Sequence, residues 1–232
     1  MPVTDKKHWR KVLHDLSSTC QDAGRDPSEV KVIAVTKGFD TNLIRDAYNF
    51  GFRHFGENQV EEGLDKKHQL RKTLPNAKWH MIGHVQSNKA RKITGEFVII
   101  HSIDRYSIIK ELAKRLRIMN QKQDIFLQVN VSGEESKYGA TAEEAPELVE
   151  EILERDVYNL NGLMTMAPWT DDEKILRETF SACRRLRDKL AEKFEIELPE
   201  LSMGMTNDYE EAIKEGATIL RLGRILFGER EG

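Results

Sequence analysis

Short apolar runs rich in β-branched residues alternate along the chain with longer, charged, amphipathic stretches. A continuous apolar run is typical of a parallel strand buried on both faces, and apolar positions three or four residues apart are typical of a helix. The runs predict strands at 32–36, 53–56, 79–82, 97–101, 125–131, 160–164, 200–203 and 218–222. The other stretches predict helices at 4–23, 41–50, 57–71, 86–94, 105–119, 141–155, 172–194 and 207–215.

This alternation of strands and helices favours a single (β/α)8 TIM-type barrel with an extra N-terminal helix. The chain has 232 residues, and such barrels begin at about 200 residues. No low-complexity linker or change of composition divides it, so we expect one domain spanning residues 1–232. An open, doubly wound sheet is the alternative. Residues suited to N-capping lie near several predicted helix starts, namely Asp40, Ser87, Asp104, Thr141 and Asn207.

Charge and composition narrow the range of partners. The 36 Lys and Arg residues are balanced by 39 Asp and Glu residues, so no positive field favours nucleic acid. No apolar run approaches the roughly 18 residues of a membrane span, and the first residues are polar, so we expect a cytoplasmic protein without membrane partners. Cys20 and Cys183 lack metal-ligand spacing and are too few for a disulfide framework, which predicts reduced thiols.

The active site of a parallel barrel lies at the C-terminal ends of its strands, which directs attention to the residues after each apolar run. Lys37 follows the first run, so barrel packing would hold its stem while its amine reaches the mouth. A partly desolvated lysine has a lowered pKa, and its neutral amine attacks aldehydes. An ordinary solvated lysine at a strand end is the alternative.

The last two predicted strands end in residues typical of a phosphate site. Glycines within 202–208 and 221–224 let backbone N–H groups approach an oxyanion, and a helix starting near Asn207 would point its positive end there. The same residues also suit ordinary turns. Lys37 would supply an amine that reacts with an aldehyde, and the residues after the last two strands would bind a phosphate. A ligand that carries both an aldehyde and a phosphate is pyridoxal 5′-phosphate.

Six motifs occur in the order found in a known family: Val-Thr-Lys at 35–37, Phe-Gly-Glu-Asn at 55–58, 79–89, Gly-Leu-Met at 162–164, 201–205 and 221–228. With them the chain resembles the pyridoxal-phosphate homeostasis proteins, small relatives of the alanine racemase barrel. The resemblance implies that Lys37 forms the Schiff base and that Arg221 faces the pyridine nitrogen. It further implies cofactor-binding roles for Asn58 and His80 at the ring, for Thr206, Gly223 and Arg224 at the phosphate, and for Met203.

Three of these residues leave room for another interpretation. The family usually carries Thr where this chain has Arg224, so the role of that side chain is open. His80, inside a predicted strand, is more often a hydrogen-bonded structural histidine. Arg221 has no acceptor and would have to donate to an unprotonated pyridine nitrogen, which weakens the ring as an electron sink. An ordinary strand-end arginine in an ion pair is the alternative for this residue. Lys137, near Asn130, is expected to be a solvated loop residue, with a second anion site as the alternative.

The implied function is a monomeric carrier that binds pyridoxal phosphate and releases it to apoenzymes, without catalysis of its own. An amino-acid racemase is one alternative, but it needs a second acid/base group and the racemases' additional β domain. The chain ends four residues after Gly228, which leaves no room for that domain. A Schiff-base lysine aldolase is the other alternative, and it does not explain Arg221.

Overall fold

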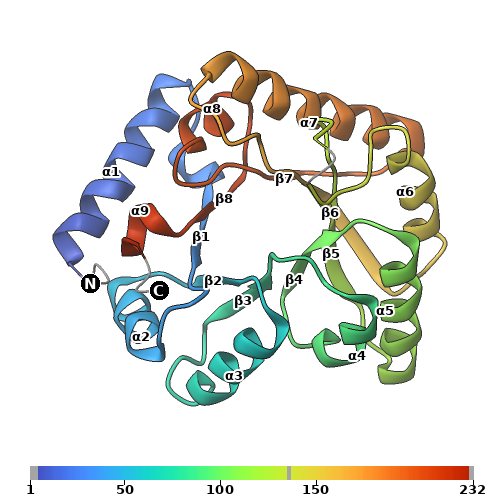
Figure 1. The fold of residues 1–232 in the computed structure, drawn as a ribbon. Coiled ribbons are helices and arrows are strands. Elements are labelled where there is room, and N and C mark those ends of the chain that lie inside the picture. Colours follow the sequence, from blue (N-terminus) through green and yellow to red (C-terminus); the bar gives the residue numbers. More distant parts are fainter. Residues whose placement is uncertain (1–4, 135–136, 230–232) are drawn as a thin grey trace.

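Eight parallel strands form a closed barrel in sequential order, surrounded by helices (Figure 1). The computed structural model describes residues 5–134 and 137–229. The strands are β1 Lys31–Val35, β2 His54–Glu57, β3 Lys78–Met81, β4 Ile99–Ile103, β5 Gln123–Gln128, β6 Tyr158–Met164, β7 Glu200–Ser202 and β8 Ile219–Leu222. β1 pairs with β8 in parallel and closes the ring. The predicted (β/α)8 barrel is confirmed, and the open sheet is wrong.

The helices follow the predicted order with shifted boundaries. They are α1 Lys6–Asp22, α2 Thr41–Phe50, α3 Val60–Leu70, α4 Ala90–Ile93, α5 Tyr106–Met119, α6 Ala145–Leu153, α7 Glu173–Phe194, α8 Tyr209–Lys214 and α9 Arg224–Phe227, with 3-10 turns at Pro27–Glu29 and Ser87–Lys89. The predicted helix 86–94 is therefore a 3-10 turn followed by a short α-helix, and α9 was not predicted. Position 4 of the predicted first helix lies outside the described residues.

Local side-chain hydrogen bonds explain two of the helix starts. Asp40 caps α2 by accepting from the N–H groups of Asn42 and Leu43, as its position predicted. Thr141 and Glu144 exchange backbone-to-side-chain hydrogen bonds of 2.9 and 3.2 Å. That reciprocal pair encloses the turn at 142–144, and α6 follows directly at Ala145.

Helix α1 packs across the outside of the barrel beside the C-terminal helix α9 (Figure 1). Its buried residues, Trp9, Val12, Leu16 and Cys20, recur at helical spacing on one face. The Trp9 indole N–H donates to the carbonyl oxygen of Leu226 at 2.8 Å. The predicted extra N-terminal helix is thus part of the folded core, and it holds the segment that follows β8.

The barrel interior has an apolar floor made by Ile33, Phe126, Met164 and Ile219, which are all buried. Gly56 adjoins this layer, because a β-carbon there would lie 2.8 Å from the Ile33 side chain. This layer closes the barrel interior below the C-terminal ends of the strands, and the cavity lies above it. In the described part of the chain, no helix is long and apolar enough to cross a membrane.

Candidate functional site

A cavity of about 330 Å³ opens at the C-terminal ends of the strands. Its lining residues are Val35 and Lys37 at the end of β1, Asn58 after β2, Ile82 after β3, 166–170 after β6, 205–208 after β7, and Arg221, Gly223 and Arg224 from β8 onward. This volume and this position are typical of small-molecule sites in barrel enzymes and binding proteins. The structure therefore brings Lys37 and the residues after the last two strands to one cavity, as the sequence predicts.

The backbone on both sides of Lys37 is held from behind by charged groups. The Lys66 ammonium donates to the carbonyl oxygen of Thr36 at 2.6 Å, and the N–H of Gly38 donates to the Glu62 carboxylate at 2.5 Å. Lys66 also donates to Glu62 at 2.6 Å. The peptide groups next to Lys37 are consequently tied to α3, which limits where its side chain can point.

Glu57 and Lys66 form a buried ion pair behind the strand that ends at Lys37. Their nitrogen and oxygen are 3.0 Å apart, and the side chains are 0% and 8% exposed. The same carboxylate oxygen accepts from the Thr36 hydroxyl at 2.6 Å. Burial raises the pKa of Glu57, while Lys66 and the hydrogen bonds act in the opposite direction. No local sequence pattern predicts this pair, because its members are nine residues apart, on a strand and a helix.

Arg221 is almost fully buried in β8 and reaches the cavity from below. Its Nη1 donates to the carbonyl oxygen of Ser202 at 2.6 Å and to the Ser202 hydroxyl at 2.9 Å, and its Nη2 donates to the carbonyl oxygen of Thr165 at 2.9 Å. Burial lowers the pKa of Arg221 to about 10, so the guanidinium stays charged at neutral pH. The side chain is thus a fixed cation and an obligatory donor.

Thr206, Gly223 and Arg224 all line the cavity, on the loops and the helix that follow β7 and β8. The Thr206 hydroxyl oxygen accepts from the N–H of Ile225 at 3.2 Å, which links the loop after β7 to α9. The Arg224 guanidinium lies 4.9 Å from the ring centre of Trp169, in a cation–π contact. The predicted phosphate-site residues are therefore neighbours, and the Arg224 side chain contacts the exposed rim.

The helix expected to start near Asn207 begins two residues later, at Tyr209, and has only six residues. The Asp208 carboxylate precedes it and accepts from the N–H of Met205. Asp208 is buried, and desolvation raises its pKa. The positive helix end predicted for the phosphate is thus displaced, because an aspartate shapes the turn there.

The structure does not bring His80 and Met203 to the cavity lining. In β7, Ser202 points into the barrel, so Met203 points outward and packs in the main hydrophobic core. Met205 lines the cavity instead. His80 is buried below the cavity and contacts other histidines, which agrees with the structural alternative for this residue.

Asn58 lines the cavity where the chain leaves β2. Its backbone passes so close to Gly83 that a β-carbon on Gly83 would lie 2.1 Å from the Asn58 carbonyl oxygen. Glycine is therefore required at position 83 for Asn58 to keep its place. Trp169, which sequence reasoning also missed, borders the cavity although 76% of it is exposed.

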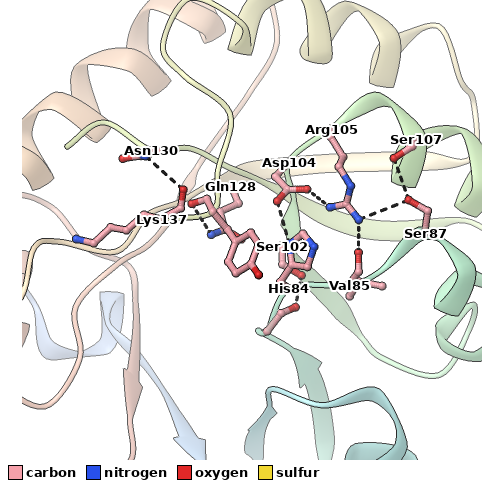
Figure 2. A network of polar contacts seen from close by, with 12 residues as sticks. His84, Val85, Ser87, Ser102, Asp104, Arg105, Ser107, Gln128, Asn130 and Lys137 are labelled. Carbon is pink, nitrogen blue, oxygen red and sulfur yellow. Dashed lines mark hydrogen bonds and ion pairs between the residues drawn. The ribbon is translucent and has the colours of Figure 1, made fainter. Parts of the chain in front are cut away.

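A polar network at the rim connects the loops after β3 and β4 (Figure 2). His84 contacts the Asp104 carboxylate at 3.2 Å, and Arg105 donates to the same carboxylate and to the Val85 carbonyl oxygen, the latter at 2.6 Å. Asp104 was predicted near a helix start, but it holds these two side chains and does not cap α5. The network stiffens the side of the mouth that lies away from β8.

Lys137 belongs to the loop after β5 at the same rim, where Figure 2 shows it beside Asn130. Its ammonium pairs with Glu134 at 3.1 Å, and only 17% of the side chain is exposed. The expectation of a freely solvated loop lysine is therefore wrong. The carboxylate partner also means that an anion at Lys137 would have to compete with Glu134.

Two buried histidines, His80 and His101, and the half-buried His54 should make the stability of the fold depend on pH. Burial lowers the pKa of His54 to about 4 and holds the pKa values of His80 and His101 well below 6.5. Below about pH 6.5 the unfolded histidines take up protons that the folded ones do not, so stability is lost as the pH falls. We expect the free energy of unfolding, measured with urea, to decrease from pH 7 toward pH 5.

A His54→Asn variant provides the control for this pH dependence and should show a shallower decrease. Glu57 and Asp208 act in the opposite sense, because their raised pKa values favour protonation of the folded state. A free energy of unfolding that stays constant or rises from pH 7 to pH 5 would contradict the neutral state of the histidines.

Comparison with known proteins places this barrel in a family. The sequence profile of the alanine racemase N-terminal domain matches residues 14–231. A pyridoxal phosphate homeostasis protein of Aquifex aeolicus is 42% identical over 221 residues, which cover 95% of this chain and 96% of that protein. The similarity extends over nearly the full length of both chains.

Solved structures agree with this assignment. A crystal structure of an unknown protein from Bifidobacterium adolescentis superposes with a TM-score of 0.90 at 32% identity, covering 96% of this chain and 94% of that one. PipY of Synechococcus elongatus, solved with PLP bound, superposes with a TM-score of 0.82 at 32% identity, covering 92% of this chain and all of that one (100%). Alanine racemase from Corynebacterium glutamicum, at 16% identity and a TM-score of 0.71, shares the fold, and the match covers 59% of its chain. The chain belongs to the pyridoxal phosphate homeostasis protein family, built on the alanine racemase N-terminal domain fold.

Proposed function

We propose that this chain binds pyridoxal phosphate through Lys37 and supplies it to apoenzymes, without catalysing amino-acid turnover itself. The main support for this proposal is that Lys37, Arg221, Thr206 and Gly223 all line the same cavity. The names of the relatives and the PLP-bound structure of PipY point the same way. An aldolase would use the lysine but leaves the buried Arg221 unexplained.

The residues of the cavity fit each functional group of this cofactor. Pyridoxal phosphate supplies an aldehyde that combines with amines and a ring that withdraws electrons. Lys37 would provide the amine, and Arg221, still protonated at neutral pH, would donate to the ring nitrogen. Thr206 and the backbone at Gly223 would donate to the phosphate, and Asn58, which also lines the cavity, would border the ring. Arg224 adds positive charge beside the phosphate.

The lining residues argue against a racemase. Removal of a proton from one face and its return on the other require two acid/base groups within hydrogen-bond reach. Among the described residues lining the cavity, there is no tyrosine, cysteine or histidine to act with Lys37. Asp208 is the acid present, and its carboxylate is engaged by the Met205 N–H. Arg221 also leaves the ring nitrogen unprotonated, which reduces electron withdrawal.

We therefore expect no significant racemisation by the purified protein with pyridoxal phosphate present. The measurement is exchange of the α-proton of L- and D-alanine in deuterated water, followed by proton NMR. An alanine racemase sample serves as the positive control. Rapid exchange with inversion would overturn the carrier proposal in favour of the enzyme.

Replacing Thr206 by valine should weaken pyridoxal phosphate binding more than pyridoxal binding. The hydroxyl is lost at nearly constant volume, and one hydrogen bond to a charged group is worth about 1.5–3 kcal/mol. Dissociation constants for both ligands, measured by absorption titration, test this. Thr179→Val is the control, since Thr179 is buried on α7 and donates to Ile175 within that helix. Equal losses for both ligands would place the phosphate elsewhere.

We further propose that residues 1–232 form one binding domain that acts as a monomer in the cytoplasm. In support, the cavity is lined by strand ends of one barrel, and no group from a second copy is needed to complete it. Cys20 and Cys183 are buried free thiols, which suits a reducing compartment. Sedimentation of the purified protein, with and without pyridoxal phosphate, tests the monomer.

A further inference from the structure

An unbroken row of hydrogen bonds crosses the barrel interior and ends at Arg221. His54 Nδ1 lies 2.9 Å from His80 Nε2, and His80 Nδ1 lies 3.0 Å from His101 Nε2. His101 Nδ1 lies 2.9 Å from the Ser202 hydroxyl, which is 2.9 Å from Arg221 Nη1. The row begins at half-buried His54, the first residue of β2, and ends below the cavity. We call His54, His80, His101 and Ser202 the histidine row, of which Ser202 contacts Arg221 directly.

The donor at one end determines the direction of every bond in the row. Arg221 can only donate, so the Ser202 oxygen accepts from it. The Ser202 proton then goes to His101 Nδ1, because the described residues offer it no other acceptor. His101 must in turn carry its proton on Nε2 and donate to His80 Nδ1, and His80 donates from Nε2 to His54 in the same way. The opposite direction would leave the buried Ser202 hydroxyl proton without a partner, at a cost of about 1–3 kcal/mol.

This arrangement requires neutral imidazoles, because each histidine within the row accepts on one nitrogen and donates from the other. The surroundings support that state. Burial is the main cause of the low pKa values of His80 and His101, and the positive charges of Lys31 and Arg221 lower the pKa of His101 further. Lys31 and Lys78 act on His54 in the same sense.

We propose that His54, His80, His101 and Ser202 are positioning residues, which hold the Arg221 guanidinium in one orientation toward the ring of the bound cofactor. The proposal rests on the proposed function for the identity of that cofactor. A single tautomer along the row keeps a lone pair of the Ser202 hydroxyl facing Arg221 Nη1, while the carbonyl oxygens of Ser202 and Thr165 accept from Nη1 and Nη2. With both ends of the guanidinium held, the side chain cannot rotate away when the ring binds.

Apolar side chains pack beside the row. Phe126 packs edge-on against His101, with ring centres 4.5 Å apart, and Ile33 lies in the same interior. Apolar side chains of similar volume would fill the barrel without the cost of burying polar groups. A row that is fully hydrogen-bonded offsets that cost and specifies one arrangement.

The first test uses the unaltered protein without cofactor. Nitrogen-15 NMR of the histidine side chains at neutral pH distinguishes the two neutral tautomers and the charged form. We expect His80 and His101 to be neutral, with the proton on Nε2. A proton on Nδ1, or a charged ring, at either position would overturn the proposed direction of the row.

The second test measures the effect on the ligand, with pyridoxal phosphate labelled with nitrogen-15 in its ring. Ser202→Ala and His80→Leu should move the ring-nitrogen resonance and weaken binding about tenfold, the equivalent of one hydrogen bond. Pyridoxal should lose affinity equally, because the ring and not the phosphate is affected. In His80→Gln, an amide that can accept and donate should return both values toward those of the unaltered protein.

Gln123→Leu is the matched control. Gln123 is also buried at the N-terminal end of the barrel, and its amide donates to the Phe97 carbonyl oxygen at 3.0 Å, outside the row. It should lose stability without moving the ring-nitrogen resonance. Unchanged resonance and affinity in Ser202→Ala would overturn the proposal, even if His80→Leu does not fold. If the unaltered protein binds no pyridoxal phosphate, the proposed function fails, while the tautomer measurement still decides the row.

Discussion

Replacing Lys37 by alanine is expected to abolish the visible absorption that pyridoxal phosphate acquires on binding, while the barrel stays folded. The Lys37 amine is the group that combines with the aldehyde. Among the described residues that line the cavity, no second lysine could take its place. The neighbouring peptides keep their bonds to Lys66 and Glu62, which do not involve the Lys37 side chain. Absorption spectra with added pyridoxal phosphate and circular dichroism measure the two outcomes.

Borohydride reduction followed by peptide mapping gives the same prediction a chemical test. The label should be found on Lys37 in the unaltered protein and be absent from the Lys37→Ala variant. Lys89→Ala is a suitable control, since Lys89 follows β3 and pairs with Glu61 outside the cavity. Unchanged absorption in Lys37→Ala, or a label on another lysine, would refute the assignment.

Replacing Lys66 by methionine should have the largest effect on stability, a loss of about 3–5 kcal/mol, because it leaves the Glu57 carboxylate buried without its cation. The Thr36 carbonyl oxygen would lose a donor as well. Urea unfolding gives the free energy. We also expect weaker pyridoxal phosphate binding, because the backbone before Lys37 loses its tie to α3.

Two variants make the Lys66 prediction specific. Lys67→Met removes the next lysine, whose partner Glu96 and own side chain are 35% and 25% exposed, so the loss should stay below about 1 kcal/mol. Glu57→Gln combined with Lys66→Met removes both charges and should recover part of the lost stability. A Lys66→Met loss no larger than that of Lys67→Met would show that the buried pair contributes little.

The order of the elements was predictable because parallel strands buried on both faces leave continuous apolar runs in the sequence. The first and last residues of each strand were harder to predict. The predicted strand at 97–101 lies two residues later, as β4 Ile99–Ile103, since pairing with β3 joins Ile99 to His80 and Val98 stays 43% exposed. Pairing between strands, which no local pattern records, decides where each strand starts.

Some residues of the candidate site were predictable from the sequence, and others were not. Lys37, Arg221, Gly223 and Thr206 were found from the sequence, because strand ends of a parallel barrel meet at one mouth and the family motifs mark them. Met203 was assigned to the cofactor, yet its side chain packs in the outer core. Alternation along β7 decides which neighbour faces the interior, and a one-residue difference reverses it.

The amino-acid pattern and motifs were enough to predict the barrel, the family, the lysine at the mouth and the arginine in the last strand. Only the tertiary structure showed the Glu57–Lys66 pair behind Lys37 and the histidine row beneath Arg221. Local propensity and strand periodicity are encoded in neighbouring residues, so they can be read along the chain. Hydrogen bonds between residues as distant as His101 and Ser202 form only when barrel closure brings their strands together, and their directions follow from the donor Arg221 at one end of the row.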